Sequence, residues 1–173
     1  MIMKSIKNIA LSAMLTFGAF AAVTYTACTK DDCKDVVCQN GGTCSGGSCT
    51  CPSGYEGANC EIASSLKFVG TYSVEENCTL SGAVGPYTAT ITQSSSNAVN
   101  ILLQNFGDFT ATISVSGSVN GTTLTIPQQT VSGYSISGNG TYTGTVTSGT
   151  LAISYNVSGA TNAESCSATW TKQ

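Results

Sequence analysis

Cysteine is the residue type with the most chemical potential in this chain, because nine of its 173 residues are cysteines. Thiols form disulfides, bind metals or act as nucleophiles. Six of the cysteines form one compact cluster, two lie far downstream, and one precedes the cluster; in that order they are Cys33, Cys38, Cys44, Cys49, Cys51 and Cys60, then Cys78 and Cys166, and Cys28. The odd total predicts eight paired thiols and one thiol with a different fate.

The other side chains offer little catalytic chemistry. The chain has no histidine, so it has no imidazole for acid–base catalysis, a Ser–His triad or a metal site. The adjacent Glu75 and Glu76 would point to opposite faces of a strand. From Cys28 onward, four lysines and no arginine stand against nine acidic residues, and a net charge of −5 does not suit nucleic-acid binding. The sequence predicts a protein that is not an enzyme and needs no cofactor.

The first 27 residues have the organisation of a removable export signal. Lys4 and Lys7 provide a positive start, and residues 9–23 form an apolar stretch that is short for a membrane-spanning helix. The segment then ends in Tyr25-Thr26-Ala27-Cys28. This ending resembles a lipobox, with Tyr25 where leucine is usual, and the resemblance implies cleavage before Cys28 and a diacylglycerol on its thiol. The alternative is ordinary signal cleavage, which would leave Cys28 as a spare thiol.

Residues 28–32 carry Lys30, Asp31 and Asp32 directly after the leftover cysteine. A lysine and two acidic residues at this place resemble the surface-export tag of some Gram-negative lipoproteins. The alternative is a solvated, charged linker. We therefore expect residues 28–32 to be a lipidated anchor and acidic tether, which holds the protein on the outer membrane with its body exposed at the cell surface.

The six clustered cysteines span residues 33–60, with intervals of 4, 5, 4, 1 and 8 residues. An exported segment of about 30 residues needs covalent bridges, because it buries too little apolar surface to fold alone. The intervals and the closing Gly54-Tyr55-Glu56-Gly57 are similar to those of an EGF-like domain. The resemblance implies three disulfides: Cys33–Cys44, Cys38–Cys49 and Cys51–Cys60. We do not expect calcium, because the loop at residues 45–48 lacks the oxygen ligands of calcium-binding members.

After a short hinge at residues 61–65, the chain becomes rich in Thr, Ser, Gly, Val and Ile. Apolar residues alternate with polar ones over residues 87–92, 109–115, 141–146 and 151–157. This period of two predicts antiparallel strands with one solvated face. The pairs Asn120-Gly121 and Asn139-Gly140 predict hairpin turns. For residues 66–173 we expect an all-β domain of eight or nine strands without a helix.

Cys78 and Cys166 share the apolar parity of the first and last predicted strands of this domain. A bridge between them would place those two strands side by side, as a sheet closed on itself requires. The expected fold is therefore mainly β, with the small disulfide-rich module followed by an antiparallel β-barrel. A β-sandwich, in which such a bridge is also possible, is the alternative.

The opening residues 68–72, Phe-Val-Gly-Thr-Tyr, resemble the Gly-x-Trp strand of lipocalin-like barrels, with Tyr72 in place of tryptophan. The resemblance implies a barrel that can hold a small apolar ligand. Inward-facing aromatic residues would line such a cavity or simply fill the core; they are Tyr72, Tyr87, Phe109, Tyr142, Tyr155 and Trp170. Glu76 interrupts the apolar parity, and we expect it to mark a barrel mouth where its carboxylate remains in water.

Three functions fit these features. The leading one is adhesion or interaction, in which the EGF-like module holds the β-domain away from the membrane and presents it to a protein or glycan at the cell surface. The second is a lipocalin-like carrier, which needs a cavity inside the barrel. The third is a structural protein of the envelope, for which a polar Thr/Ser surface and covalent bridges suffice.

Overall fold

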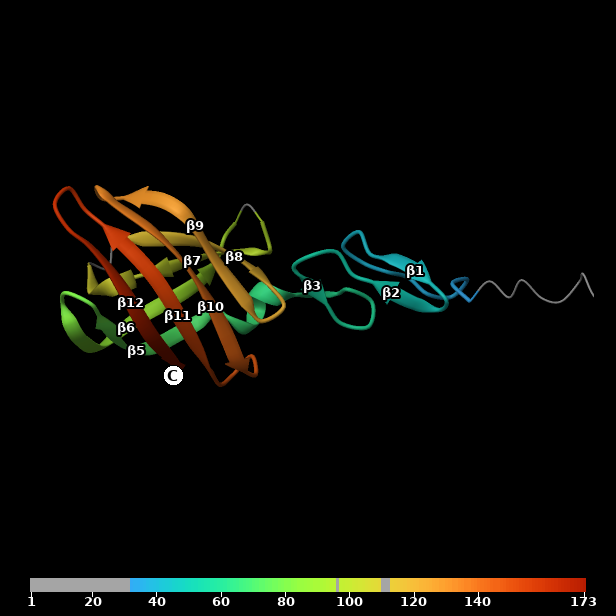
Figure 1. The fold of residues 1–173 in the computed structure, drawn as a ribbon. Helices are drawn as coiled ribbons and strands as arrows, with labels where there is room; N and C mark the ends of the chain where they lie inside the picture. Colours follow the sequence, from blue (N-terminus) through green and yellow to red (C-terminus); the bar gives the residue numbers. More distant parts are fainter. Residues whose placement is uncertain (1–31, 96, 110–112) are drawn as a thin grey trace, which may run out of the picture.

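The computed structural model describes residues 32–173, with the exception of residues 96 and 110–112. The expected signal segment, Cys28 and most of the tether lie outside the described residues. Within the described part of the chain, no helix has the length and apolarity to cross a membrane. Figure 1 shows a small module joined to one end of a larger barrel.

The module contains two small antiparallel sheets. Strands β1 (Thr43–Ser45) and β2 (Ser48–Thr50) form a hairpin, and β3 (Tyr55–Glu56) pairs with β4 (Ile62–Ala63). The hairpin turn is Gly46-Gly47, and both residues have positive φ, as a tight two-residue turn requires. The disulfides Cys33–Cys44, Cys38–Cys49 and Cys51–Cys60 hold the module together. These pairs are the three that the sequence resemblance implies.

The predicted hinge at residues 61–65 is wrong, because this segment is part of a packed junction. It contributes β4 and enters the 3-10 helix η2 (Ser64–Lys67), and Ser64 and Ser65 are 1% and 0% exposed. Polar residues can be buried here because each hydroxyl has partners. Ser64 Oγ accepts a hydrogen bond of 3.2 Å from Gly121 N, while Ser65 Oγ donates to Ala98 O and accepts from Gln93 Nε2 at 2.9 Å.

Gly54 is a point of close contact between the module and the barrel. Its N–H donates to Asn120 Oδ1 at 3.2 Å, and its carbonyl accepts from Ser64 N at 2.8 Å. A Cβ atom at Gly54 would lie 2.0 Å from Val99 Cγ1, and the residue has a φ of +85°. An ion pair of 2.7 Å between Lys67 and Glu56 adds a further link. These contacts fix the module on the barrel end.

The barrel is closed and consists of eight antiparallel strands in the order β10-β11-β12-β5-β6-β7-β8-β9. The strands are β5 (Gly70–Cys78), β6 (Gly82–Gln93), β7 (Asn100–Gln104), β8 (Ser114–Asn120), β9 (Thr123–Val131), β10 (Tyr134–Gly144), β11 (Gly149–Ser158) and β12 (Ala163–Lys172). The expected barrel is confirmed, and the sandwich alternative is wrong. Two short 3-10 helices, η2 and η3 (Phe106–Asp108), are present where no helix was predicted.

Closure occurs between the first and last barrel strands. Strand β5 pairs with β12 from Cys78↔Cys166 to Tyr72↔Lys172, and a disulfide joins Cys78 to Cys166. The alternation expected from the sequence places Tyr72, Val74 and Cys78 inside. On β12, the same alternation places Cys166, Ala168 and Trp170 inside. The barrel core is therefore built from one face of every strand.

Of the two predicted hairpin turns, one is confirmed and one is wrong. Strand β8 ends at Asn120, and Gly121 turns with a φ of +57° into β9. Asn139-Gly140 instead lies inside β10, which packs tightly on β11: a Cβ at Gly140 would lie 2.9 Å from Ala152 O. The turn before β10 is Ser132-Gly133, where both residues have positive φ.

The predicted strand at residues 109–115 is also wrong at its start, because Phe109 follows η3 and strand β8 begins only at Ser114. Val146 was expected on an inward parity but is 56% exposed, since β10 ends at Gly144. Asp108 has a φ of +52°, which an extended strand does not allow. Alternation in the sequence therefore continued beyond the true strand ends.

The two barrel ends differ. The module packs on one end, near residues 64–67, 98–99 and 120–121. We call the opposite end the mouth and define it by the segments 79–81, 105–109, 132–134 and 157–164. Figure 1 shows the β5–β6 and β11–β12 loops at the side of the barrel away from the module.

Removal of the barrel disulfide tests closure. The double variant Cys78→Ala/Cys166→Ala should lose roughly 4–5 kcal/mol of unfolding free energy, because the bridge closes a loop with a sequence separation of 88 residues. Urea denaturation of the oxidised protein and the variant measures this difference. A loss below about 1 kcal/mol would show that strand pairing alone holds β5 against β12.

A Gly54→Ala variant tests the rigid junction. The new methyl group would overlap Val99, so we expect the module to separate from the barrel end while the barrel keeps its own melting transition. Amide relaxation by NMR would report different tumbling for the two parts. Gly46→Ala is the matched control, because Gly46 also has positive φ but a Cβ there would have no neighbour within 4 Å. If the module and the barrel tumble together in Gly54→Ala as they do in Gly46→Ala, then the contact at Gly54 is not what fixes the module on the barrel.

Candidate functional site

The six aromatic residues predicted to line a ligand cavity are divided between the core and its edge. Four of them are at most 3% exposed and belong to the continuous hydrophobic core: Tyr72, Tyr142, Tyr155 and Trp170. Tyr87 and Phe109 are partly buried and pack against this core. The sequence therefore located the rings on the correct side of the sheet, and the structure shows that most of them are in the packed interior.

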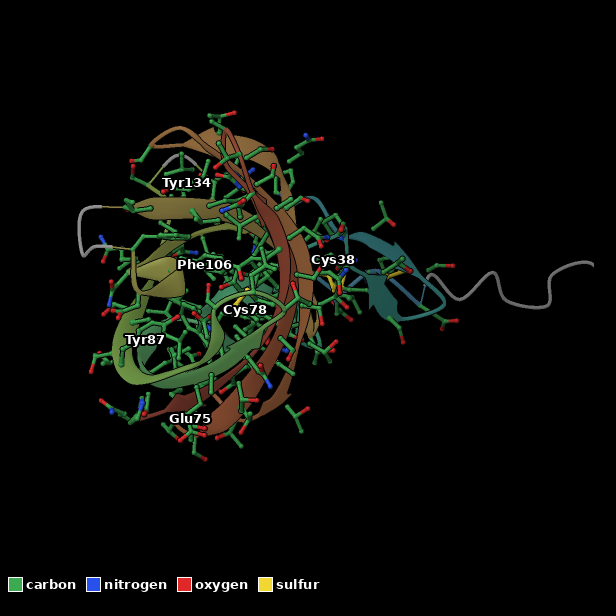
Figure 2. All side chains as sticks on the ribbon, turned by 60° about the vertical axis from the view of Figure 1, so that its left-hand side comes forward. Cys38, Glu75, Cys78, Tyr87, Phe106 and Tyr134 are labelled. Carbon is green, nitrogen blue, oxygen red and sulfur yellow. A yellow bond between two sulfur atoms is a disulfide. The ribbon has the colours of Figure 1, made fainter. Side chains whose placement is uncertain are left out.

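Contacts between rings fill the barrel along its length. Nearer the module, Phe68 lies 5.3 Å from Tyr142 and Tyr72 lies 5.8 Å from Trp170, measured between ring centroids. Toward the mouth, Phe106 lies 4.6 Å from Tyr155 and 6.0 Å from Trp170. Phe106 is fully buried, and Figure 2 shows it within the barrel. Ring packing of this kind leaves the described interior filled with side chains.

The sequence analysis did not predict that Phe106 is a core residue at the mouth end of the barrel. It lies on η3, and it turns inward because Asn105 and Gly107 on either side have φ values of +55° and +67°. Asn and Gly are the residues that adopt this left-handed conformation most readily. The Asn-Phe-Gly triplet was the available signal for a turn in place of a strand.

The module end of the barrel is closed by Lys172. Its Nζ donates to Lys67 O at 3.0 Å and to Val146 O at 2.6 Å. It also lies 5.8 Å from the ring centroids of both Tyr72 and Tyr142. Burial lowers the pKa of this amine. These contacts and the junction both lie at the module end of the barrel.

Glu76 does not stay in water as predicted, because its side chain is buried inside the barrel at 7% exposure. The Tyr155 hydroxyl donates to Glu76 Oε2 at 2.9 Å, and the Tyr87 hydroxyl is also hydrogen-bonded to this carboxyl. Tyr87 in turn accepts a bond of 3.1 Å from Gly107 N. The partners of Glu76 come from β11 and β6, which is why sequence spacing gave no sign of them.

Burial raises the pKa of Glu76, and the hydrogen bonds from Tyr155 and Tyr87 oppose this effect. The nearby negative charges of Asp108 and Glu164 raise the pKa further. Burial and the adjacent carboxyl raise the pKa values of Tyr87 and Tyr155 as well, so both phenols remain protonated donors. Glu76 and the two phenols thus form a polar layer, hydrogen-bonded within itself, on the mouth side of the aromatic core.

The mouth contains a hollow of about 560 Å³. Its lining comes from four loops and the strand ends beside them: Leu80, Ser81, Phe109, Ser132, Gly133, Tyr134, Val157, Gly159, Ala160, Thr161, Asn162 and Glu164. Tyr134 is 41% exposed and stacks on Phe109 with ring centroids 5.2 Å apart. Figure 2 shows Tyr134 at the rim of the barrel, while Glu75 lies on its outer wall.

Glu164 is the carboxylate of this hollow, and its position is fixed. Oε2 accepts from Ser81 N at 3.0 Å and Leu80 N at 3.3 Å, and the Ser81 hydroxyl donates to the carboxylate at 3.0 Å. The bond from Ser81 N is the main reason that the pKa of Glu164 is lowered. The carboxylate also lies within 4.8 Å of the Cys78 and Cys166 sulfur atoms, but these are bonded to each other and so cannot serve as thiolate ligands.

Comparison with known proteins finds a distant structural likeness. No family model and no curated protein matches the chain. A crystal structure of a protein of unknown function from Bacteroides ovatus matches with 13% sequence identity and a TM-score of 0.42. The match covers 61% of this chain and 42% of that protein, so the chain spans less than half of its length.

A Glu76→Gln variant tests the buried carboxyl through pH. Because the folded-state pKa is raised above the ordinary value of 4.5, ionisation of Glu76 costs the folded protein stability as pH rises through that raised pKa. We expect Glu76→Gln to melt at a higher temperature than the wild type at pH 7.5, with the gain vanishing below pH about 4.5. A difference of about 1 kcal/mol shifts melting by roughly 4–8 °C in a domain of this size.

Glu75→Gln is the matched control for this experiment, since Glu75 is an exposed neighbour on the same strand. It removes the same charge and should leave melting unchanged. If Glu76→Gln instead destabilises the protein equally at both pH values, then the hydrogen bonds of the carboxylate outweigh the cost of burying it.

Proposed function

We propose that this protein is a lipid-anchored binding protein of the bacterial outer-membrane surface. In this proposal the disulfide-rich module is an EGF-like spacer, and the barrel presents its mouth to a protein or glycan. The protein acts by binding, without catalysis. The observation that carries the proposal is the opposite placement of the rigid junction and the open hollow on the two ends of one barrel.

Cysteine pairing supports the lipid anchor. All eight cysteines of the described chain pair with one another, so none of them is a partner for Cys28. A diacylglycerol on this thiol accounts for the odd cysteine, and the lipobox-like segment before it supplies the cleavage site. A diacylglycerol supplies two acyl chains, which suffice for stable anchoring, and a tether of a few residues would place the module next to the membrane.

The filled interior favours binding at the mouth over a carrier function. A carrier of a small apolar ligand needs free volume among its inward rings, and the described rings pack on one another at 4.6–6.0 Å. The mouth, in contrast, offers a hollow lined by polar and apolar groups.

Intact mass of the protein extracted from its native membrane tests the anchor. We expect a chain that starts at Cys28 and carries a lipid, with a gain of eight hydrogens when its four disulfides are reduced. A Cys28→Ser variant should leave the membrane fraction, whereas replacement of Lys30, Asp31 and Asp32 by alanine should keep the anchor but lose cleavage by protease added to whole cells. A lipid-free wild-type chain would overturn the anchored display that we propose.

A further inference from the structure

Charge is distributed unevenly along the barrel axis. The barrel sequence from residue 66 onward has six charged residues: Lys67, Glu75, Glu76, Asp108, Glu164 and Lys172. Both lysines lie at the module end, where Lys67 pairs with Glu56 and Lys172 binds backbone carbonyls. The four acidic residues lie in the half that leads to the mouth. The described mouth therefore carries negative charge with no lysine to neutralise it.

The carboxylates at the mouth act on one another. Asp108 and Glu164 both raise the pKa of Glu76, which means that each is close enough for its charge to reach the buried layer. Among the described residues, the one salt bridge is at the junction with the module. A positive charge that entered the hollow would reduce this repulsion, so the mouth favours cationic ligands and disfavours anionic ones.

The Glu164 carboxylate is preorganised to accept a hydrogen bond from a ligand. The bonds from Leu80 and Ser81 hold its carboxylate in one position, so little side-chain entropy is lost when a ligand binds. An ionised carboxylate accepts about four hydrogen bonds. Three donors from residues 80–81 already bind this one, two of them to Oε2, so Oε1 retains room for about one more donor. A nitrogen donor with a positive charge makes the strongest bond to such a group.

The ring of Tyr134 supplies the second element of recognition. It is 41% exposed at the hollow, and Phe109 stacks against it and holds its orientation. An ammonium or guanidinium group near an aromatic ring gains cation–π attraction, and the methylenes of its side chain gain apolar contact. Asn162 and Ser132, which also line the hollow, provide neutral polar groups for a peptide backbone.

We propose that the mouth hollow binds a lysine or arginine side chain displayed on a peptide segment of a partner protein. This inference rests on the proposed function, because it names the ligand of the same mouth. Glu164 accepts a hydrogen bond from the cationic group, Tyr134 contacts its side chain, and Asp108 adds long-range attraction. Phosphate-bearing and acidic polymers are excluded from the hollow by the same field.

NMR titration tests the proposal with the chain from residue 28, in which Cys28→Ser permits purification without lipid. The probes are capped pentapeptides with lysine or arginine between two glycines on either side, and the control probe has norleucine at the centre. We expect amide shifts of Ser81, Tyr134 and Asn162 with the cationic peptides, and weaker binding as salt increases. The norleucine peptide should bind at least about fivefold more weakly than the lysine peptide, which is the ratio expected for one ion pair of about 1 kcal/mol.

Two variants separate charge from fold. Glu164→Gln keeps an acceptor for residues 80–81 but should weaken lysine binding about fivefold, and Tyr134→Leu should weaken it about two- to fivefold. Glu75→Gln makes the same change in net charge on the outer wall and should leave binding unchanged. An unchanged amide spectrum outside the mouth shows that each variant is folded.

Three outcomes would overturn the inference: equal binding of norleucine and lysine, equal effects of Glu164→Gln and Glu75→Gln, or shifts that lie outside the mouth. Equal binding of norleucine and lysine would leave the mouth as the binding face and remove only its preference for cations. The same conclusion would follow if only a neutral oligosaccharide shifted these amide signals. Shifts confined to the barrel wall would overturn the inference and the proposed role of the mouth together.

Discussion

The pairing of β5 with β12 is the constraint on which the rest of the structure depends. It closes the sheet, so no barrel strand retains an unpaired edge, and it brings Cys78 and Cys166 into register for a disulfide. Closure also determines what the inward residues meet, because the aromatic rings of β5, β10, β11 and β12 converge on one axis. The polar layer of Glu76, Tyr87 and Tyr155 exists only because three strands are held around it.

A barrel of eight strands has an interior that side chains can fill, and here aromatic and aliphatic side chains form one buried cluster. The chemistry available to other molecules is therefore found where the strands end. At the module end, Lys172 donates to backbone carbonyls and the serines of η2 are buried. At the mouth, the chain keeps its carboxylates and an exposed tyrosine. In the function that we propose, the two ends of this small domain serve as an attachment side and a contact side.

Local signals in the sequence predicted the features that depend on spacing and parity. The resemblance to an EGF-like domain implied the three module disulfides, and alternation placed Tyr72, Tyr142, Tyr155 and Trp170 inside. Features that depend on contacts between distant segments were not visible. Glu76 was expected to be solvated because its partner Tyr155 is 79 residues away in the sequence. Residues 61–65 were expected to be a hinge because the groups that contact Ser64 and Ser65 lie at residues 93–121. Phe106 was missed because alternation nearby masked a turn.

The junction and the closure together determine how the molecule would respond to mechanical force. A pull between the module and a partner held at the mouth enters the barrel through η2 and reaches β5 first. This strand has neighbours on both sides, and its hydrogen bonds to β6 and β12 run across the direction of pull, so they share the force in shear. The disulfide at the mouth end of β5 passes tension to β12 by a covalent link. Such a pull would therefore load β5 in shear, and the disulfide would limit its separation from β12.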